Sequence, residues 1–131
     1  MKRLICLALL LMGMNAPASA QTSYAYYGFE PDIVTNYISP SAKKLGYIRV
    51  TIELMITDAG DLGTLEHHSP LLRATTIEIL GRQPEGKIKS LTGREDIRRT
   101  ILDNLKELLR QETGKEIVKD VIFTKYLYQG G

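Results

Sequence analysis

The clearest pattern of hydrophobic and polar positions in the chain is a strict alternation from Tyr47 to Thr57. Five apolar residues occupy every second position, namely Ile48, Val50, Ile52, Leu54 and Ile56. Successive side chains of a strand point to opposite faces, so this period of two predicts a long strand that is covered on one face. Two glycines and two aspartates between Asp58 and Gly63 predict the turn that ends it.

A helix is expected from Ser69 to Gly81. Ser69 is a good N-cap, Pro70 suits the first helical position, and Gly81 can close the helix in the left-handed cap conformation. Between the turn at Asp58 to Gly63 and this helix, a short separate helix through Leu65 and His68 is expected. The residues expected to face the core are Leu72, Thr76, Ile79 and Leu80.

A second, amphipathic helix comes after a polar connection over residues 82–89. Thr92 and Glu95 have the spacing of a capping box, and the helix is expected to run to about Glu112, with Gly114 past its end. Its apolar residues form one stripe: Ile97, Ile101, Leu105 and Leu108, joined by Leu102 and Leu109. This stripe predicts a helix that lies on a sheet.

Further strands are predicted from Asp32 to Ile38 and from Ile117 to Tyr128. In the second of these, strict alternation places Val121, Phe123 and Leu127 on one face and Val118, Ile122, Tyr126 and Tyr128 on the other. Two similarly apolar faces indicate a central strand, or one whose second face a partner covers. The predicted fold class is α+β, a small antiparallel-rich sheet with a long central strand, covered by two or three helices.

An aromatic segment precedes these elements. Tyr24, Tyr26, Tyr27 and Phe29 lie within six residues. Two interpretations remain open: a recognition arm that contacts a partner through Tyr26, Tyr27 and Phe29, or a strand edge packed on the core, which is the commoner arrangement.

The N-terminal residues have the order of a secretory signal peptide. A basic start at Lys2 and Arg3 is followed by an apolar run from Leu4 to Met14 and by a small-residue cleavage site ending at Ala20. Eleven apolar residues rise only about 16 Å as a helix, against a hydrocarbon core of roughly 30 Å. The sequence therefore predicts a signal peptide over residues 1–20 and one exported domain over residues 21–131, starting at Gln21 and without a membrane span.

Composition and charge narrow the function classes. The chain has 131 residues, 44% hydrophobic and 24% charged, which is typical of one globular domain and too short for a two-domain enzyme. Loss of Lys2 and Arg3 from the 17 basic residues would leave as many basic as the 15 acidic residues. A neutral mature chain argues against nucleic-acid binding. The single cysteine, Cys6, lies in the signal peptide, so no disulfide or lipid anchor is expected.

Candidate chemistry is sparse. Ser41 and Lys44 have the spacing of a nucleophilic serine and its lysine, but the companion motifs of such enzymes are absent. His67 and His68 are adjacent, so on a helix they point about 100° apart and cannot chelate one ion. Asp58 and Asp61 lack the other ligands of a calcium loop. We expect no catalytic residue, no metal and no cofactor.

A dense charge cluster lies near the start of the long helix: Arg94, Glu95, Asp96, Arg98 and Arg99. Such clusters are usually a solvated face. The alternative is that they hold an acidic segment of a partner, in which case Arg94 and Arg98 are the candidate binding residues.

Five segments, in this order and spacing, resemble the periplasmic domain of the flagellar basal-body-associated FliL family: residues 30–36, 47–54, 69–80, 91–97 and 118–126. The resemblance implies a fold similar to stomatin and prohibitin domains and a non-enzymatic motor accessory. It also implies a periplasmic location at the basal body and the inner membrane, a ring-forming homo-oligomer, and flagellar stator or basal-body proteins as partners. Typical members carry an uncleaved transmembrane helix, whereas this chain has a predicted signal peptide.

Two other functions remain open beside this one. The first is a generic periplasmic module that binds a peptide or small ligand through the segment from Tyr24 to Phe29. The second is a small hydrolase built on Ser41 and Lys44.

Overall fold

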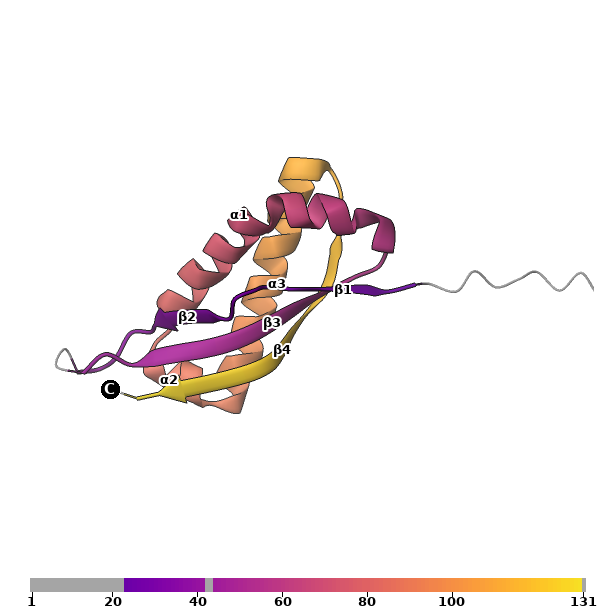
Figure 1. The fold of residues 1–131 in the computed structure, drawn as a ribbon. Coiled ribbons are helices and arrows are strands. Elements are labelled where there is room, and N and C mark those ends of the chain that lie inside the picture. The colour runs from indigo at the N-terminus through magenta and orange to yellow at the C-terminus, as the bar shows by residue number, and fades with distance from the viewer. Residues whose placement is uncertain (1–22, 42–43, 131) are drawn as a thin grey trace, which may run out of the picture.

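The computed structural model describes residues 23–41 and 44–130. The predicted signal peptide, residues 1–20, and the predicted first residue of the exported protein, Gln21, lie outside the described residues. In chain order the elements are β1 (Ala25–Gly28), β2 (Ile33–Asn36), β3 (Tyr47–Ile56), the 3₁₀ turn η1 (Ala59–Asp61), α1 (Leu62–Gly81), α2 (Glu85–Lys89), α3 (Leu91–Thr113) and β4 (Val118–Gln129). The fold is α+β, as the sequence predicts (Figure 1).

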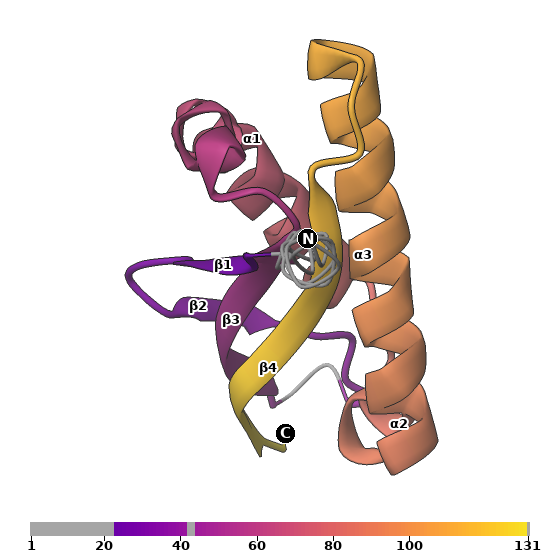
Figure 2. The same ribbon diagram turned by 90° about the vertical axis from the view of Figure 1, so that its right-hand side faces the viewer.

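β3 is the centre of a four-stranded antiparallel sheet. β4 pairs with β3 along its whole length, from Tyr47 to Ile56. β1 pairs with the second half of β3 and β2 with the first half, so these two short strands share the opposite side of β3 (Figure 2). The long central strand of the prediction is therefore confirmed.

The alternation along β3 sorts its side chains as expected. Its five predicted core residues are fully buried: Ile48, Val50, Ile52, Leu54 and Ile56. They pack against apolar residues of α1 and α3, including Leu72, Ile97 and Ile101, which cover this face of the sheet (Figure 1). The opposite face of the sheet, called here the open face, has no helix over it among the described elements.

The predicted faces of β4 are wrong, and of the two alternatives predicted for this strand, the central position is wrong. β4 pairs only with β3 in the described part of the chain, so it lies at the sheet edge. Two register shifts interrupt its pairing, one opposite Thr51 and Ile52 and one opposite Met55 and Ile56. Each shift adds one unpaired residue and moves the next residues of the strand to the other face. As a result Val118, Val121, Phe123, Tyr126 and Tyr128 lie opposite the buried residues of β3.

α1 is one helix where two were expected. It begins at Leu62, runs through Ser69 and contains Pro70 in its interior, so Ser69 is not an N-cap. Pro70 removes one backbone hydrogen bond and favours a bend, which is visible in α1 (Figure 1). Leu65 and Leu72 are fully buried on either side of Pro70, and this packing holds the helix together across the proline.

The end of α1 also differs from the prediction. Gly81 is not in the left-handed conformation, and Arg82 ends the helix with a right-handed backbone whose N–H donates to Ile79 and Leu80. The predicted core residues Leu72, Thr76 and Leu80 are buried, and Ile79 is partly buried against the core.

α2 lies within the predicted polar connection and buries Ile88. The N-cap of α3 is Ser90, whose hydroxyl oxygen accepts from the N–H of Gly93 at 2.9 Å. The predicted capping box of Thr92 and Glu95 is therefore wrong. The C-terminal prediction is confirmed, because Gly114 comes directly after Thr113 with a left-handed φ of 80°.

The apolar stripe of α3 faces the core as predicted. Its buried members are Ile97, Ile101, Leu105 and Leu109, and Leu102 and Leu108 are partly buried. Among the described residues, no helix combines the length and the apolarity needed to cross a bilayer.

Candidate functional site

A groove between α3 and β4 brings together the two arginines that are candidate binding residues, Arg94 and Arg98. Its volume is about 430 Å³, and its lining residues are Leu91, Arg94, Glu95 and Arg98 of α3 and Asp120, Val121, Ile122 and Phe123 of β4. The first turns of α3 thus face the β4 edge, some 25 residues later in the chain. We call this feature the α3–β4 groove.

Arg98 is the centre of an ion-pair network in the lining of the α3–β4 groove. Its guanidinium binds both carboxylate oxygens of Glu95, at 2.8 and 2.6 Å, and Asp120 at 2.5 Å. Arg99 adds a contact of 3.2 Å to Glu95. The hydrogen bond from Arg98 lowers the pKa of Glu95 to about 2, and the same bond raises the pKa of Arg98.

Asp120 and Arg98 also bind the β4 backbone. The N–H of Val121 donates to Asp120 at 2.8 Å, and the carbonyl oxygen of Val121 accepts from Arg98 at 3.4 Å. These two backbone groups point away from β3, since the N–H and C=O of one strand residue face the same side. Side chains therefore satisfy the β4 edge at this position, which protects it from pairing with another strand.

Arg94 has a different environment. Its guanidinium lies over two aromatic rings of β4, 4.7 Å from the ring centre of Tyr126 and 5.8 Å from that of Phe123. The Tyr126 hydroxyl donates to the carbonyl oxygen of Ile88 at 2.7 Å, and burial raises its pKa to about 12. The ring beneath Arg94 is therefore neutral and fixed in place, which favours cation–π stacking.

The aromatic candidates lie elsewhere, on β1 and just after it. Phe29 is 2% exposed, and its ring belongs to the core. Tyr27 is partly buried and meets Phe29 edge to face, with ring centres 6.1 Å apart. Tyr26 is 53% exposed and opposes Met55 on the open face. Phe29 and Tyr27 therefore pack on the core as the packed-strand interpretation predicts, while Tyr26 is the most exposed of the three, and contact of this segment with a partner stays a prediction.

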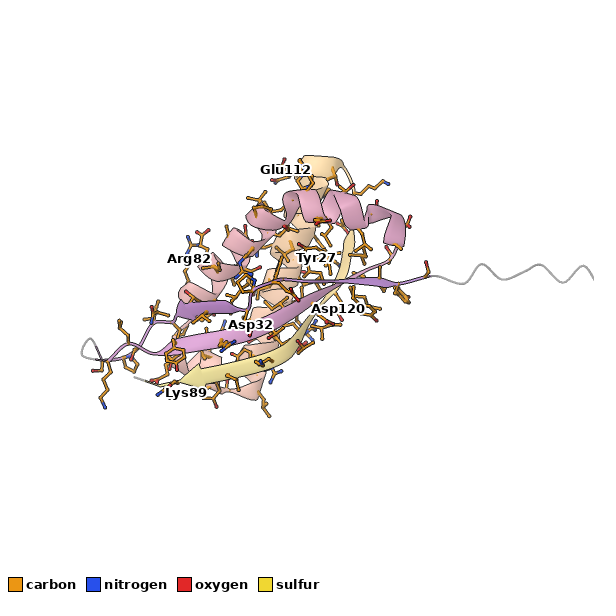
Figure 3. All side chains as sticks on the ribbon, viewed as in Figure 1. Tyr27, Asp32, Arg82, Lys89, Glu112 and Asp120 are labelled. Atoms are coloured by element: carbon orange, nitrogen blue, oxygen red, sulfur yellow. The ribbon has the colours of Figure 1, made fainter. Side chains whose placement is uncertain are left out.

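The open face carries a polar cluster that is not among the candidates predicted from the sequence. Asp32 accepts from Arg49 at 2.9 Å and from Thr51 at 2.8 Å, and Lys125 lies 3.8 Å away. The Thr51 and Arg49 hydrogen bonds lower the pKa of Asp32. Arg49 and Thr51 lie two positions apart on the open face of β3. The alternation in the sequence predicts that they share this face, but it does not predict that Asp32 joins them. Asp32 and Asp120 mark the two polar clusters in Figure 3.

The histidine and aspartate candidates make contacts within their own segments. The rings of His67 and His68 meet edge to face, with ring centres 5.1 Å apart. Nδ1 of His68 forms a hydrogen bond with the carbonyl oxygen of Thr64, one turn earlier in α1. Asp58 accepts from the N–H of Gly60 and caps the 3₁₀ turn. Within the described ranges, no three His, Cys, Asp or Glu residues gather as metal ligands would. Ser41 and Lys44 are exposed and precede β3.

Comparison with known proteins identifies the family. The family model described as "Flagellar basal body-associated protein FliL" matches residues 26–129. This range includes all the described helices and strands except Ala25, the first residue of β1. The chain belongs to the FliL family. It is also 27% identical over 103 residues to the flagellar protein FliL of Aquifex aeolicus (strain VF5). That alignment covers 79% of this chain and spans about 60% of the relative's length.

Of the residues that line the α3–β4 groove, only Arg94 and Arg98 are among the binding residues predicted from the sequence, and apolar members such as Leu91 and Phe123 are not. No signal for Leu91 was present, because it lies 18 residues, or about five whole helical turns, before Leu109, which is a buried member of the apolar stripe. Phe123 carried no signal either, since its face depends on the register shifts of β4.

Proposed function

We propose that this protein is a non-enzymatic accessory of the flagellar basal body that associates with stator units and supports motility. The observation that carries the proposal is the family match over residues 26–129, which coincides with the folded domain. Fold and family locate a protein more securely than they fix its partner, so the stator is a proposed partner and is tested separately from the family.

A periplasmic location and a homo-oligomeric ring are part of the same proposal. Exposed apolar side chains on the open face support an assembly, since they remain in contact with water in the single chain: Tyr26, Val34, Tyr47 and Leu127. A surface of this kind is common where proteins associate.

Deletion of the gene tests the accessory function. We expect colonies that spread less in soft agar and on swarm plates while filaments are still assembled, because a motor accessory affects force transmission and not flagellin export. Filaments are counted by microscopy. Normal spreading of the deletion strain would refute the motor function and favour a periplasmic peptide-binding module, for which the α3–β4 groove provides a surface.

Replacement of Ser41 by alanine separates the accessory function from catalysis. We expect the Ser41→Ala strain to swim and swarm like the parent strain. If this single change reproduced the deletion phenotype, an enzymatic function built on Ser41 and Lys44 would replace the accessory function.

A further inference from the structure

Arg94 has no carboxylate partner in the described part of the chain, although it lies in a region rich in charges. Arg98 and Arg99 share Glu95, and Arg98 also binds Asp120, whereas no ion pair between described residues involves Arg94. Its guanidinium instead rests on Tyr126 and Phe123. Stacking holds the guanidinium plane in a fixed orientation and leaves its edge donors available to a carboxylate.

Apolar surface adjoins Arg94 on both sides of the α3–β4 groove. Leu91, one turn earlier on α3, is 85% exposed, and Ile122 and Phe123 of β4 are only partly buried. An apolar side chain placed between them would remove this surface from water, which is favourable roughly in proportion to the area covered. A carboxylate group and an apolar group side by side therefore match the groove.

Four consecutive residues of β4, 120–123, line the groove, and β4 pairs only with β3 among the described strands, so an extended segment can lie along this edge. At Val121, however, Asp120 and Arg98 already satisfy the backbone N–H and C=O. A ladder of backbone hydrogen bonds cannot form there, so side-chain contacts with Arg94, Leu91 and Phe123 must provide most of the recognition.

We propose that the α3–β4 groove binds an extended acidic segment of another protein, with an aspartate or glutamate on Arg94 and a neighbouring apolar side chain against Leu91 and Phe123. The inference rests on the proposed accessory function only in taking the ligand to be a protein segment. Charge complementarity selects the acidic segment, because Arg94 is the groove cation that no acidic residue of the described chain neutralises.

A pair of synthetic peptides tests this proposal in the purified full chain, without any motility measurement. One peptide alternates leucine and glutamate, and the other has glutamine at each glutamate position. Both are acetylated and amidated, so that no terminal carboxylate is present. Fluorescence anisotropy of the labelled peptides should show saturable binding of the glutamate peptide and at least ten-fold weaker binding of the glutamine peptide.

Matched substitutions on one helix locate the binding. Arg94→Gln should weaken binding of the glutamate peptide at least ten-fold, and Leu91→Ser should weaken it at least three-fold. Arg99→Gln is the control, because Arg99 is an exposed arginine of α3 that does not line the groove, and it should change affinity less than two-fold. All three positions are on the surface, and thermal melts verify that each variant is folded.

Three outcomes would overturn the proposal: no saturable binding, equal affinity for both peptides, or equal weakening by Arg94→Gln and Arg99→Gln. Self-association that Arg94→Gln abolishes, in the absence of peptide binding, would assign the groove to a second copy of the chain. A normal deletion phenotype would refute the motor function while leaving these binding results unaffected.

Discussion

At the scale of single residues, neighbouring arginines of α3 have separate tasks. Arg98 is bound to Glu95 and Asp120 and holds α3 against β4, whereas Arg94 stacks on aromatic rings and keeps its donors available. From the sequence alone the two are alike, since both lie in the same run of charges. Their difference arises from β4, which presents a carboxylate to one arginine and rings to the other.

The pairing of Glu95 predicts a pH dependence of stability. The hydrogen bond from Arg98 lowers the pKa of Glu95 to about 2 in the folded protein, below its ordinary value of 4.5. The stabilisation of the folded state by this ion pair is therefore complete above about pH 4.5 and is lost as the pH falls toward 2. We expect Glu95→Gln to lower the melting temperature at pH 7. This difference from the parent protein should shrink as the pH falls from 4.5 to 2.

Asp103→Asn is the control for this measurement. Asp103 is an exposed carboxylate in the middle of the same helix, and no ion pair of the described residues includes it. Its substitution should change the melting temperature little at either pH. A Glu95→Gln difference that stayed constant between pH 7 and pH 2 would contradict the assigned role of the ion pair.

At the scale of elements, the junction of α2 and α3 is packed backbone against backbone. A Cβ added at Gly93 would lie 2.1 Å from the carbonyl oxygen of Lys87 and 2.6 Å from its Cα atom. Main-chain atoms of a helix cannot move aside as a flexible side chain can. Gly93 is therefore what allows α3 to begin directly beside α2, and so it also positions Leu91 and Arg94 at the groove.

Gly93→Ala should destabilise the protein by about 1–3 kcal/mol, the usual cost of overpacking a filled interior. Gly63→Ala is the matched control, because Gly63 lies in the first turn of α1 with no atom within 4 Å of the added Cβ. That change should be neutral or stabilise by up to about 1 kcal/mol, since alanine is the better helix former. Denaturant melts measure the free energy of unfolding of both variants. An equal change in this free energy for the two would show that the backbone at Lys87 moves away from the added methyl group.

At the scale of the whole molecule, the open face and the α3–β4 groove are the two surfaces that we propose for association. The open face carries exposed apolar residues and the Asp32 cluster, while the α3–β4 groove lies between α3 and the edge strand β4. Two residues of β4, Asp120 and Ile122, belong to both surfaces, because they lie opposite Met55 and Glu53 on the open face and also line the groove.

The sequence predicts that the protein is exported and that residues 1–20 are removed. The exported protein should begin at Gln21, because a basic start, a short apolar run and a small-residue site end at Ala20. Intact mass of the protein from a periplasmic fraction measures this. A mass that includes residues 1–20 would instead indicate that the apolar segment is retained.

Local periodicity determined those elements whose pattern is regular and whose ends carry their own signals. The alternation of β3 needs no knowledge of its partners, because every second side chain must be apolar to cover one face. The stripe of α3 and the left-handed glycine at Gly114 are equally local, since helix geometry sets the first and backbone sterics the second. For this reason the α+β class, the long strand and the amphipathic helix are predictable from the sequence.

Tertiary structure decided the features that depend on contacts between distant segments. Pro70 stays inside a helix because burial of Leu65 and Leu72 outweighs a lost hydrogen bond. The faces of β4 result from two register shifts against β3, and these reflect how both strands twist and pack together. The register shift opposite Thr51 and Ile52 places Phe123 on the same face as Tyr126, so that both rings lie beneath Arg94. No local pattern contains that information, since a one-residue change in pairing exchanges the two faces of a strand.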